Sequence, residues 1–379
     1  MASSITIAPA IIRRLKTPSF TEQAENMQHD TSQITQAQPA ETEGVISLFS
    51  GCGGFDLGFS SAGFPIGLAL DVDAMAVKSY NHNRDKDVCH VADLAETDAE
   101  GVMKLYREHC GIVSPRGVIG GAPCQTFSSG NVHFNGDDAR HLLPRRYACM
   151  LRVLNEKYDL DFFVFENVKG ITSPKHQKEY RTIKRLFSRA GFRLFEGELD
   201  AVEFGVAQHR CRVFIVGFNK LKYPDLEFKF PSAETSVSLT VASKLKGLPQ
   251  PLLFKRGTRK DDIAFHPNHW TMYPRSRKFT DGSLTNGHKQ GRSFRVLKWE
   301  KPSLTVAYGN REIHIHPDAK RRLSVYEAML LQGFPGDYEL LGTLSDQIRQ
   351  VSDAIPPQLG AALGKAIYDT LFRGKSDER

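Results

Sequence analysis

Two side chains with catalytic potential each follow an apolar segment of the chain. Cys124 lies in GGAPCQTFSSGN, where Gly and Pro open a turn directly after the apolar run GVIGG. A thiol at the head of a helix gains acidity from the helix dipole, and a nucleophilic cysteine needs such a lowered pKa. Glu166 ends the nearly continuous apolar run DFFVFE, where burial should raise the pKa of its carboxyl group. We therefore expect a nucleophile and a proton donor that works near neutral pH.

The other cysteines give no comparable signal. The chain has six cysteines in 379 residues, too few for a disulfide scaffold, and no two of them form a C-x-x-C pair. We expect reduced thiols in a cytoplasmic protein, of which one or two matter chemically. The cysteines are Cys52, Cys89, Cys110, Cys124, Cys149 and Cys211.

A glycine-rich turn in SLFSGCGGFDLGF lies between an apolar strand pattern and a helix pattern. Backbone N–H groups in such a turn can approach a nucleotide-like ligand. The dinucleotide fingerprint is incomplete, because the sixth position counted from Gly51 is Asp56, which would repel a pyrophosphate. A ligand with a ribose and a cationic or zwitterionic end fits better, and this favours S-adenosylmethionine.

Two acids at expected strand ends extend this prediction. Asp71 follows the apolar run IGLAL, where an acid would bind ribose hydroxyls, and Asp93 in HVADL could read the adenine edge. Each acid taken alone is more often a helix cap than a ligand. Their order along the chain and their places at strand ends favour the cofactor interpretation.

The elements that must position these residues alternate along residues 45 to about 220. Short apolar runs read as strands, and longer segments with helical spacing lie between them. This alternation predicts an α/β fold with a doubly wound, mostly parallel sheet and ligands at the carboxyl ends of its strands. The expected strands are VISLF, IGLAL, GVIGG, DFFVFEN and RVFIVGF, with a further short one before HVADL.

The positive charge is concentrated in one segment. The whole chain has 50 Lys and Arg against 43 Asp and Glu, a net charge of +7. Residues 242–311 alone hold 15 against 4, a net of +11, so the rest sums to −4. This segment shows no clear helix and contains both tryptophans, Trp270 and Trp299, among other aromatic residues. Cations for phosphates and flat side chains for bases are typical of a nucleic-acid interface, with a solvated basic surface as the alternative.

Six motifs in order carry a family resemblance. They are SLFSGCGGF, APCQ, FENV, QHRCR, RRLSVYEAMLLQGFP and VSDAIPPQLGAALGKAI, and they span about residues 44–220 and 302–370. The set strongly resembles the DNA cytosine-5 methyltransferase family, in particular the bacterial type II modification enzymes. The resemblance implies a Rossmann-like, S-adenosylmethionine-dependent catalytic domain that faces a smaller, loop-rich target-recognition domain across a cleft.

The resemblance also implies a mechanism. Cys124 would attack C6 of a cytosine flipped out of duplex DNA, and Glu166 would hydrogen-bond the ring nitrogen and the exocyclic amine. The methyl group then passes from S-adenosylmethionine to C5, which gives 5-methylcytosine and S-adenosylhomocysteine. Arg210 and Arg212 match active-site arginines that would hold the base carbonyl and a neighbouring phosphate or acid.

Binding residues carry over in the same way. Phe49 matches an aromatic residue that stacks on adenine, Asp71 the ribose-binding acid, and Val72 the apolar residue on the other adenine face. The predicted cofactor residues are Phe49, Ser50, Gly51, Cys52, Gly53, Gly54, Phe55, Asp71, Val72, Asp93, Pro123, Asp353 and Ala354. The predicted DNA-binding residues are Gln125, Ser128 and Asn131, in a segment that would move over the flipped base, and Arg275, Arg277, Lys278, Arg292, Arg295 and Arg311.

We expect four parts: a disordered tail (1–43), a catalytic and cofactor-binding domain (44–225), a target-recognition domain (226–335), and a hinge with a returning C-terminal helix (336–379). The expected partner is double-stranded DNA, and the resemblance allows a cognate restriction endonuclease. No apolar run is long enough to span a membrane, and the N-terminus lacks the order of a secretory signal. We therefore expect a monomer in the bacterial cytoplasm, associated with the nucleoid.

Some positions depart from the family pattern. Asp353 stands where Asn is usual, which puts a contact at the cofactor end in doubt. Ala207 replaces a common Pro, and Tyr326 and Leu330 replace common arginines. None of them touches the Cys–Glu pair, so we expect activity to survive.

Other interpretations remain open. A transfer-RNA-type cytosine-5 methyltransferase shares the catalytic motifs, but a variable segment of more than 80 residues favours DNA. A non-catalytic DNA-binding protein is disfavoured by the intact catalytic motifs, and a nicotinamide oxidoreductase by Asp56. Histidine pairs in HPNHW and HIHP lack thiol or carboxylate partners at ligand spacing, so we expect no metal.

Overall fold

The computed structural model describes residues 43–110, 113–123, 142–233, 239–285, 294–305 and 314–373. All of them belong to one compact unit, Ala40–Arg379. Almost all of the expected N-terminal tail lies outside the described residues. Within the described ranges, no helix is both long enough and apolar enough to cross a membrane.

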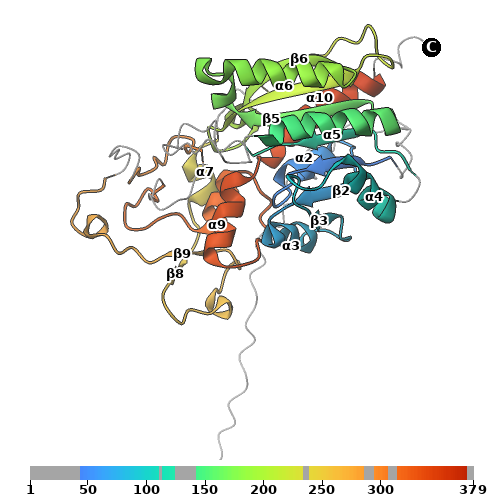
Figure 1. Ribbon diagram of the computed structural model, residues 1–379. Helices are drawn as coiled ribbons and strands as arrows, with labels where there is room; N and C mark the ends of the chain where they lie inside the picture. The colour runs from blue at the N-terminus through green and yellow to red at the C-terminus, as the bar shows by residue number, and fades with distance from the viewer. Residues whose placement is uncertain are drawn as a thin grey trace, which may run out of the picture. The chain divides into compact units, whose positions relative to one another are not determined.

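A seven-stranded sheet forms the centre of this unit, with the strand order β3-β2-β1-β4-β5-β7-β6 (Figure 1). The strands β1 to β5 pair in parallel, whereas β7 runs antiparallel to both β5 and β6. The strand order reverses between β1 and β4, and ligands of open α/β sheets bind at the carboxyl ends of strands at such a point. The strands are β1 Val45–Leu48, β2 Ile66–Asp71, β3 Cys89–Val91, β4 Gly117–Gly120, β5 Phe162–Val168, β6 Phe192–Asp200 and β7 Cys211–Asn219.

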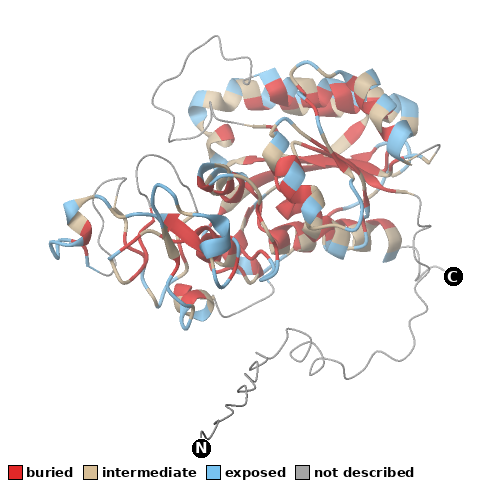
Figure 2. Cartoon of the chain, turned by 90° about the horizontal axis from the view of Figure 1, so that it is seen from below, coloured by how far each residue is buried: buried red, intermediate tan, exposed pale blue. Residues whose placement is uncertain are grey.

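Helices cover both faces of the sheet, so its central strands are apolar at nearly every position. Ile46 and Leu48 of β1 face one cluster, with α4, α5 and α6, whereas Val45 faces the other, with α2, α3 and α10. Figure 2 shows the buried sheet between helices whose outer sides are exposed. The helices are α2 Gly54–Ser61, α3 Ala74–His82, α4 Ala99–Cys110, α5 Leu143–Tyr158, α6 Gln177–Arg189 and α10 Pro357–Tyr368.

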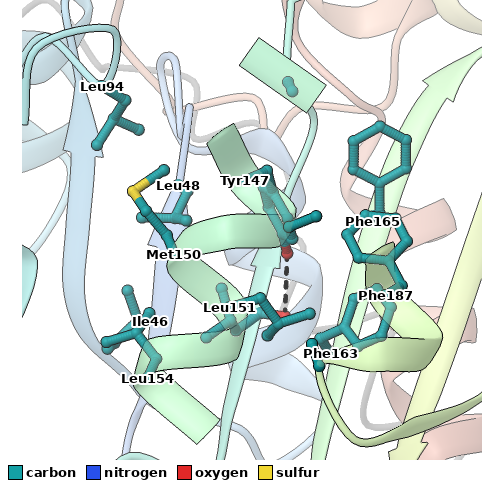
Figure 3. Packing of buried hydrophobic residues seen from close by; sticks show 14 of the residues in the cluster. Ile46, Leu48, Leu94, Tyr147, Met150, Leu151, Leu154, Phe163, Phe165 and Phe187 are labelled. Carbon is teal, nitrogen blue, oxygen red and sulfur yellow. Dashed lines mark hydrogen bonds between the residues drawn. The ribbon is translucent and has the colours of Figure 1, made fainter. Parts of the chain in front are cut away.

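The strand β5 lies on a dense aromatic core. Tyr147 of α5 and Phe187 of α6 pack against Phe163 and Phe165 of the strand, with ring centroids 4.6–6.4 Å apart (Figure 3). The Tyr147 hydroxyl donates to the Val164 carbonyl at 2.9 Å, so this buried polar group has a partner. The end of β5 is therefore held in a fixed position.

A second, two-stranded parallel sheet follows, formed by β8 Leu252–Phe254 and β9 Trp270–Met272. Three helices accompany it, and each begins at a hydroxyl residue with a complete capping box: Thr240, Ser324 and Thr343. A capping box satisfies two backbone donors at a helix start and so fixes where the helix begins. The helices are α7 Val241–Leu245, α8 Val325–Leu331 and α9 Leu344–Asp353.

Buried hydrogen bonds tie this region to the rest of the unit. Ser303 N donates to the Ala207 carbonyl at 2.8 Å, and its own carbonyl accepts from His209 N at 2.9 Å. Within the region itself, the Trp270 indole N–H donates to Gln347 of α9 at 2.7 Å. The bond at Ala207 uses its carbonyl, which a proline would also have, so this contact does not depend on which of the two residues is present.

The fold class predicted from the sequence is confirmed by the sheet and its helices. All the expected strands are present. The strand β6 was not predicted, because FRLFEGELD lies at the sheet edge and mixes half-buried apolar residues with exposed glutamates. The expectation of no helix in the basic segment was wrong at α7, five residues long. The predicted boundaries at 225 and 335 remain predictions.

Close contact between α2 and α10 depends on glycine. A Cβ placed on Gly58 would lie 2.2 Å from the Pro357 carbonyl oxygen and 2.4 Å from Ala361 N, both backbone atoms of α10. Backbone atoms cannot move aside cheaply, so a side chain here would push the helices apart.

We predict that Gly58→Ala lowers the melting temperature by at least about 3 °C, because overpacking costs about 1–3 kcal/mol. The control is Gly101→Ala in α4, where a new Cβ would lie 2.9 Å from the Thr97 side-chain methyl carbon, so a side chain and not the backbone must move. Alanine favours a helix there, so no loss is expected. Thermal unfolding followed by circular dichroism measures both, and equal losses would contradict this account of the packing.

Candidate active site

The strand β5 ends in a buried carboxylate. Glu166 is 8% exposed, and its Oε1 lies 2.8 Å from Nε of Arg212. Arg212 belongs to β7, where it pairs with Val168, so its side chain shares a sheet face with that of Glu166. The antiparallel register of β5 and β7 therefore creates this ion pair.

Burial raises the pKa of Glu166 above its usual value. The positive charges of Arg212 and Arg210 and the hydrogen bond from Arg212 act in the opposite direction, but burial outweighs them. A carboxyl group with a raised pKa keeps its proton to higher pH. Glu166 thus has the property that the sequence predicted for a proton donor.

The turn that leads to Cys124 contacts this carboxylate. A Cβ on Gly121 would lie 2.5 Å from Oε2 of Glu166, so only glycine leaves room for the carboxylate. Asn167, the next residue of β5, donates to the Ala122 carbonyl at 3.3 Å. Residues 121–123 therefore pass directly beside Glu166, and Cys124 itself lies outside the described residues.

Arg210 occupies a different position from the one expected. Its side chain is buried, and it donates to the Ser352 carbonyl at 3.0 Å and the Asp353 carbonyl at 3.2 Å. Burial lowers the pKa of Arg210, and the charge of Arg212 adds to this effect. Of the two predicted arginines, Arg212 is therefore the one that contacts Glu166, while Arg210 holds the end of α9.

The glycine-rich turn follows β1 in an unusual backbone conformation. Phe49, Gly51 and Gly53 have positive φ angles of 58°, 54° and 89°. Glycine adopts such angles without strain, which explains the glycines of this turn. A Cβ on Gly54 would lie 2.3 Å from the Ile355 carbonyl, so the turn also needs glycine to pack on the segment after α9.

Asp71 at the end of β2 holds this turn. Its Oδ2 accepts from Gly51 N and its Oδ1 from Asp73 N, both at 2.8 Å. Burial raises the pKa of Asp71 despite these two bonds. A carboxylate has about four acceptor sites, so two remain for ribose hydroxyls. Apart from Gly51 and its two chain neighbours, no atom of the described residues lies within 4 Å of the position of a Cβ on Gly51, and this arrangement fits the ribose end of S-adenosylmethionine.

Apolar and polar candidates lie beside Asp71. Val72 is 63% exposed, unusual for a valine that directly follows a buried strand, whereas Phe49 is half-buried against the core. Asp93 is exposed, and its side chain accepts from Ala95 N at 2.8 Å. Asp93 thus makes a local turn contact, whereas the alternative that the sequence suggested for it was a helix cap.

Three further cofactor candidates, Cys52, Asp353 and Ala354, lie at the end of α9. The Cys52 thiol, 3.6 Å from the Gln350 carbonyl, is buried, and burial raises its pKa well above the usual value. The Tyr338 hydroxyl donates to the Cys52 carbonyl. Asp353 is exposed and Ala354 is buried. Cys52 therefore supports the turn and is not a reactive thiol.

Asp56 does not face the ligand side of the turn. Its carboxylate is fully buried and accepts from the Ser47 and Tyr80 hydroxyls, both at 2.8 Å. The argument that Asp56 would repel a pyrophosphate was therefore wrong, since its side chain points into the core. It anchors the start of α2.

Some of the predicted DNA-binding residues are described. Arg275 and Arg277 are exposed, Lys278 lies with its Nζ 4.7 Å from the Phe294 ring centre, and Arg295 is half-buried. The sequence missed an exposed group on the ends of β8 and β9, consisting of Phe254 (41% exposed), Met272 (41%), Tyr273 (46%) and Lys255. The predicted residues Gln125, Ser128, Asn131, Arg292 and Arg311 lie outside the described part of the chain.

The histidines of HPNHW and HIHP are buried. His266 stacks on Tyr326 with ring centres 4.0 Å apart. His269 Nδ1 and the Ser324 hydroxyl oxygen form a hydrogen bond of 3.0 Å. Burial lowers the pKa of His266 to about 4. Among the residues that the structure describes, no cluster of three His, Cys, Asp or Glu side chains could hold a metal ion.

A family model described as C-5 cytosine-specific DNA methylase matches residues 44–369. The chain belongs to this family. It is a DNA (cytosine-5-)-methyltransferase, as the order of its motifs predicted. S-adenosylmethionine is the methyl donor that membership of the family implies.

Relatives cover nearly the whole methyltransferase. The chain is 32% identical to the type II methyltransferase M.FnuDI of Fusobacterium nucleatum, over 86% of this chain and 94% of the relative. It is 30% identical to M.NgoPII of Neisseria gonorrhoeae, over 87% and 96%. The solved structure of the Dnmt2 methyltransferase of S. pombe has the same fold, with a TM-score of 0.60 at 16% identity over 86% and 98% of the two chains.

The departures from the methyltransferase pattern have structural substitutes. Tyr326 stacks on His266, and its hydroxyl donates to the Gly336 carbonyl at 3.2 Å. Leu330 is half-buried on α8. The Asp353 backbone accepts from Arg210, a contact that does not depend on an asparagine side chain.

We predict a pH-dependent gain of stability for Glu166→Gln. The folded-state pKa of Glu166 is raised, so the parent protein loses stability as pH rises from about 4.3, the ordinary value, through the folded-state pKa. The variant lacks this loss. Its free energy of unfolding relative to the parent should therefore increase with pH and level off above the folded-state pKa.

Urea unfolding between pH 4 and pH 9 measures this difference. The control is Glu203→Gln, which makes the same chemical change at an exposed glutamate. A difference that falls as pH rises would mean that the attraction of Arg212 outweighs burial, and it would contradict the raised pKa.

Proposed function

We propose that this methyltransferase modifies C5 of cytosine within a specific sequence of double-stranded DNA, with Cys124, Glu166 and Arg212 as its chemical centre. The observation that carries the proposal is the buried Glu166 carboxylate, which is paired with Arg212. The chain at Gly121, which leads to Cys124, packs directly against this carboxylate. A nucleophile and a proton donor on adjoining segments can act on opposite parts of one flipped base.

In this proposal the Cys124 thiolate attacks C6, and an S–C6 bond forms while the C5–C6 electron pair moves to C5. Glu166 donates a hydrogen bond or proton to the ring nitrogen, which stabilises the negative charge that develops in the ring. C5 then takes the methyl group that S-adenosylmethionine supplies. Loss of the C5 proton restores the C5–C6 double bond and expels Cys124.

Arg212 has a double role in the proposal. Its Nε holds the Glu166 carboxylate and its Nη1 donates to the Cys211 carbonyl at 2.8 Å, so the N–H groups of Nη2 are suited to the carbonyl of the base. Asn167 fixes the Ala122 carbonyl and with it the path of the chain toward Cys124. These contacts place the acid before the base arrives, which lowers the cost of reorganisation during the reaction.

The cofactor residues are proposed from the donor set. Asp71 has two acceptor sites left for ribose hydroxyls, and Phe49 and Val72 offer apolar surface for the two faces of adenine. Asp93 would accept from the adenine amine in addition to its turn contact. The other proposed cofactor residues are Ser50, Gly51, Cys52, Gly53, Gly54, Phe55, Pro123, Asp353 and Ala354.

Specificity for DNA is proposed to depend on the basic segment 242–311. Its net charge of +11 suits the phosphates, and the exposed Phe254, Met272 and Tyr273 add apolar and aromatic surface beside Lys255. Lys255 Nζ lies 5.0 Å from the centre of the Tyr273 ring, so a cation and a flat ring are presented together. We propose that the enzyme acts as a monomer in the cytoplasm, with a restriction endonuclease of the same specificity as its companion.

Transfer of tritium from labelled S-adenosylmethionine to mixed-sequence duplex DNA tests this function. We predict tritiated 5-methylcytosine with the parent protein and at least a thousandfold lower rate with Cys124→Ala, because covalent activation is lost. Cys149→Ala, at an exposed cysteine elsewhere, should keep full activity. Transfer to purified transfer RNA but not to DNA would favour the RNA alternative, and transfer retained by Cys124→Ala would contradict the mechanism.

Charge reversal tests the proposed DNA surface. We predict that changing Arg275, Arg277 and Lys278 to Glu weakens duplex binding. The slope of log binding constant against log salt concentration should become less steep by up to about 3, since each phosphate contact contributes about 0.9. Filter binding at several salt concentrations measures the slope. S-adenosylhomocysteine binding by the same variant should stay nearly unchanged.

A control variant carries the same change of charge elsewhere. Lys178, Arg181 and Arg185 are exposed residues of α6, and their change to Glu alters the net charge equally. This control should keep most of its salt dependence. Equal loss in both variants would indicate a general charge effect and would count against a localised DNA surface.

A further inference from the structure

The carboxyl end of α9 is held by side chains from two distant segments. Arg210 donates to the carbonyls of Ser352 and Asp353 at 3.0 and 3.2 Å. Gln332 Nε2 donates to the carbonyls of Val351 and Ala354 at 2.9 and 2.5 Å. The last carbonyls of a helix have no partner within the helix, and here four consecutive ones are bonded by side chains.

The two side chains belong to one connected network, which we call the α9 latch and which consists of Gln208, Arg210, Gln332 and residues 351–354. Gln332 is fully buried at the end of α8, and its Oε1 accepts from Gln208 Nε2 at 3.3 Å. Gln208 and Arg210 lie in the segment that enters β7. Three segments therefore meet at one helix end, and residues 208–210 are more than a hundred positions before the other two.

The latch lies between the catalytic carboxylate and the glycine-rich turn. On one side, Arg210 is two residues from Arg212, the partner of Glu166. On the other side, the Cys52 thiol reaches the Gln350 carbonyl at 3.6 Å. Gly54 leaves room for the Ile355 carbonyl, which a Cβ would approach to 2.3 Å. Residues 350–355 are thus packed on the turn, while Arg210 and Gln332 bind the carbonyls of residues 351–354.

The chemistry of the latch is costly for folding alone. Arg210 is a buried cation, and within the described part of the chain its Nε has no hydrogen-bond partner. The carboxyl end of a helix attracts a cation, which offsets part of the cost of burial. An apolar side chain would fill the same space at lower cost, so a role beyond packing accounts better for an arginine here.

We propose that Gln332 and Arg210 are positioning residues that fix residues 350–355 against the glycine-rich turn and so set the affinity for S-adenosylmethionine. The inference rests on the proposed function, because it takes this turn as the cofactor site. In this proposal Arg210 acts on the cofactor end of the site, because it holds the end of α9. Gln332, which the sequence did not single out, has the same role.

Gln332→Leu tests the proposal, because leucine has a similar volume and cannot donate. We expect the KM for S-adenosylmethionine to rise about tenfold, which corresponds to about 1.4 kcal/mol, the scale of one or two lost hydrogen bonds. The kcat at saturating cofactor and the KM for DNA should stay within about twofold. Calorimetric binding of S-adenosylhomocysteine should weaken by the same factor as the KM rises.

Gln358→Leu is the matched control. Gln358 Nε2 donates to the carbonyl of Gly333, the residue after Gln332, at 2.7 Å. Among the described residues, Gln358 makes no hydrogen bond to the carbonyls of α9. This variant also removes a glutamine bond to a backbone carbonyl. It should lower the melting temperature by a comparable amount and leave cofactor affinity unchanged.

Arg210 provides a second series. Arg210→Lys keeps a cation and donors near the Ser352 carbonyl, so it should retain more cofactor affinity than Arg210→Met. If Arg210→Met does not fold, the comparison of Gln332→Leu with its control still decides the matter.

Two results would overturn the proposal. One is a lower melting temperature for Gln332→Leu with unchanged affinity for S-adenosylhomocysteine, which would make the latch purely structural. The other is a fall in kcat alone, which would place Gln332 in the chemical step. Failure of the proposed function is distinguishable, because it would appear as a parent protein that binds S-adenosylhomocysteine but does not methylate DNA.

Discussion

The arrangement of the site depends on one buried ion pair, Glu166 with Arg212. The strand β5 lies inside the sheet and is covered on both faces, so the carboxylate at its end has little access to water. Arg212 reaches it because β7 runs antiparallel in a register that pairs Arg212 with Val168. A slip of one residue would turn the arginine to the opposite face and leave Glu166 without its cation. Sheet register therefore determines the electrostatics of the site.

The same segment that carries Arg212 also connects the other parts of the site. Within this segment, Ala207 and His209 form backbone hydrogen bonds with Ser303. Arg210 donates to the carbonyls at the end of α9. The end of α9 packs on the glycine-rich turn, whose conformation Asp71 holds through Gly51 N. The proposed catalytic acid Glu166, the glycine-rich turn and the basic region thus share a small number of buried polar contacts. Such contacts are costly when broken, which makes their geometry well defined.

Much of the fold and part of the site could be predicted from the sequence. Apolar runs locate the strands, and the structure places Glu166 and Asp71 near the carboxyl ends of parallel strands, as the sequence predicted. The partner of Arg210 could not be found, because it lies about 140 residues away and local periodicity carries no information on such pairing. Gln332 carried no signal for the same reason. Asp56 was misjudged, since an acid in a helix pattern gives no sign that buried hydroxyls will bind it.

The central claim is that Glu166 and Cys124 act on one cytosine, and trapping the covalent intermediate tests it most directly. A mixed-sequence duplex with 5-fluorocytosine in place of cytosine lets the S–C6 bond form and C5 accept the methyl group, but fluorine cannot leave as a cation in place of the proton. The account predicts a stable protein–DNA adduct that requires S-adenosylmethionine, maps to Cys124 by peptide mass and forms much more slowly in Glu166→Gln. Methylation of ordinary duplex DNA without any adduct, or an adduct at another cysteine, would contradict it.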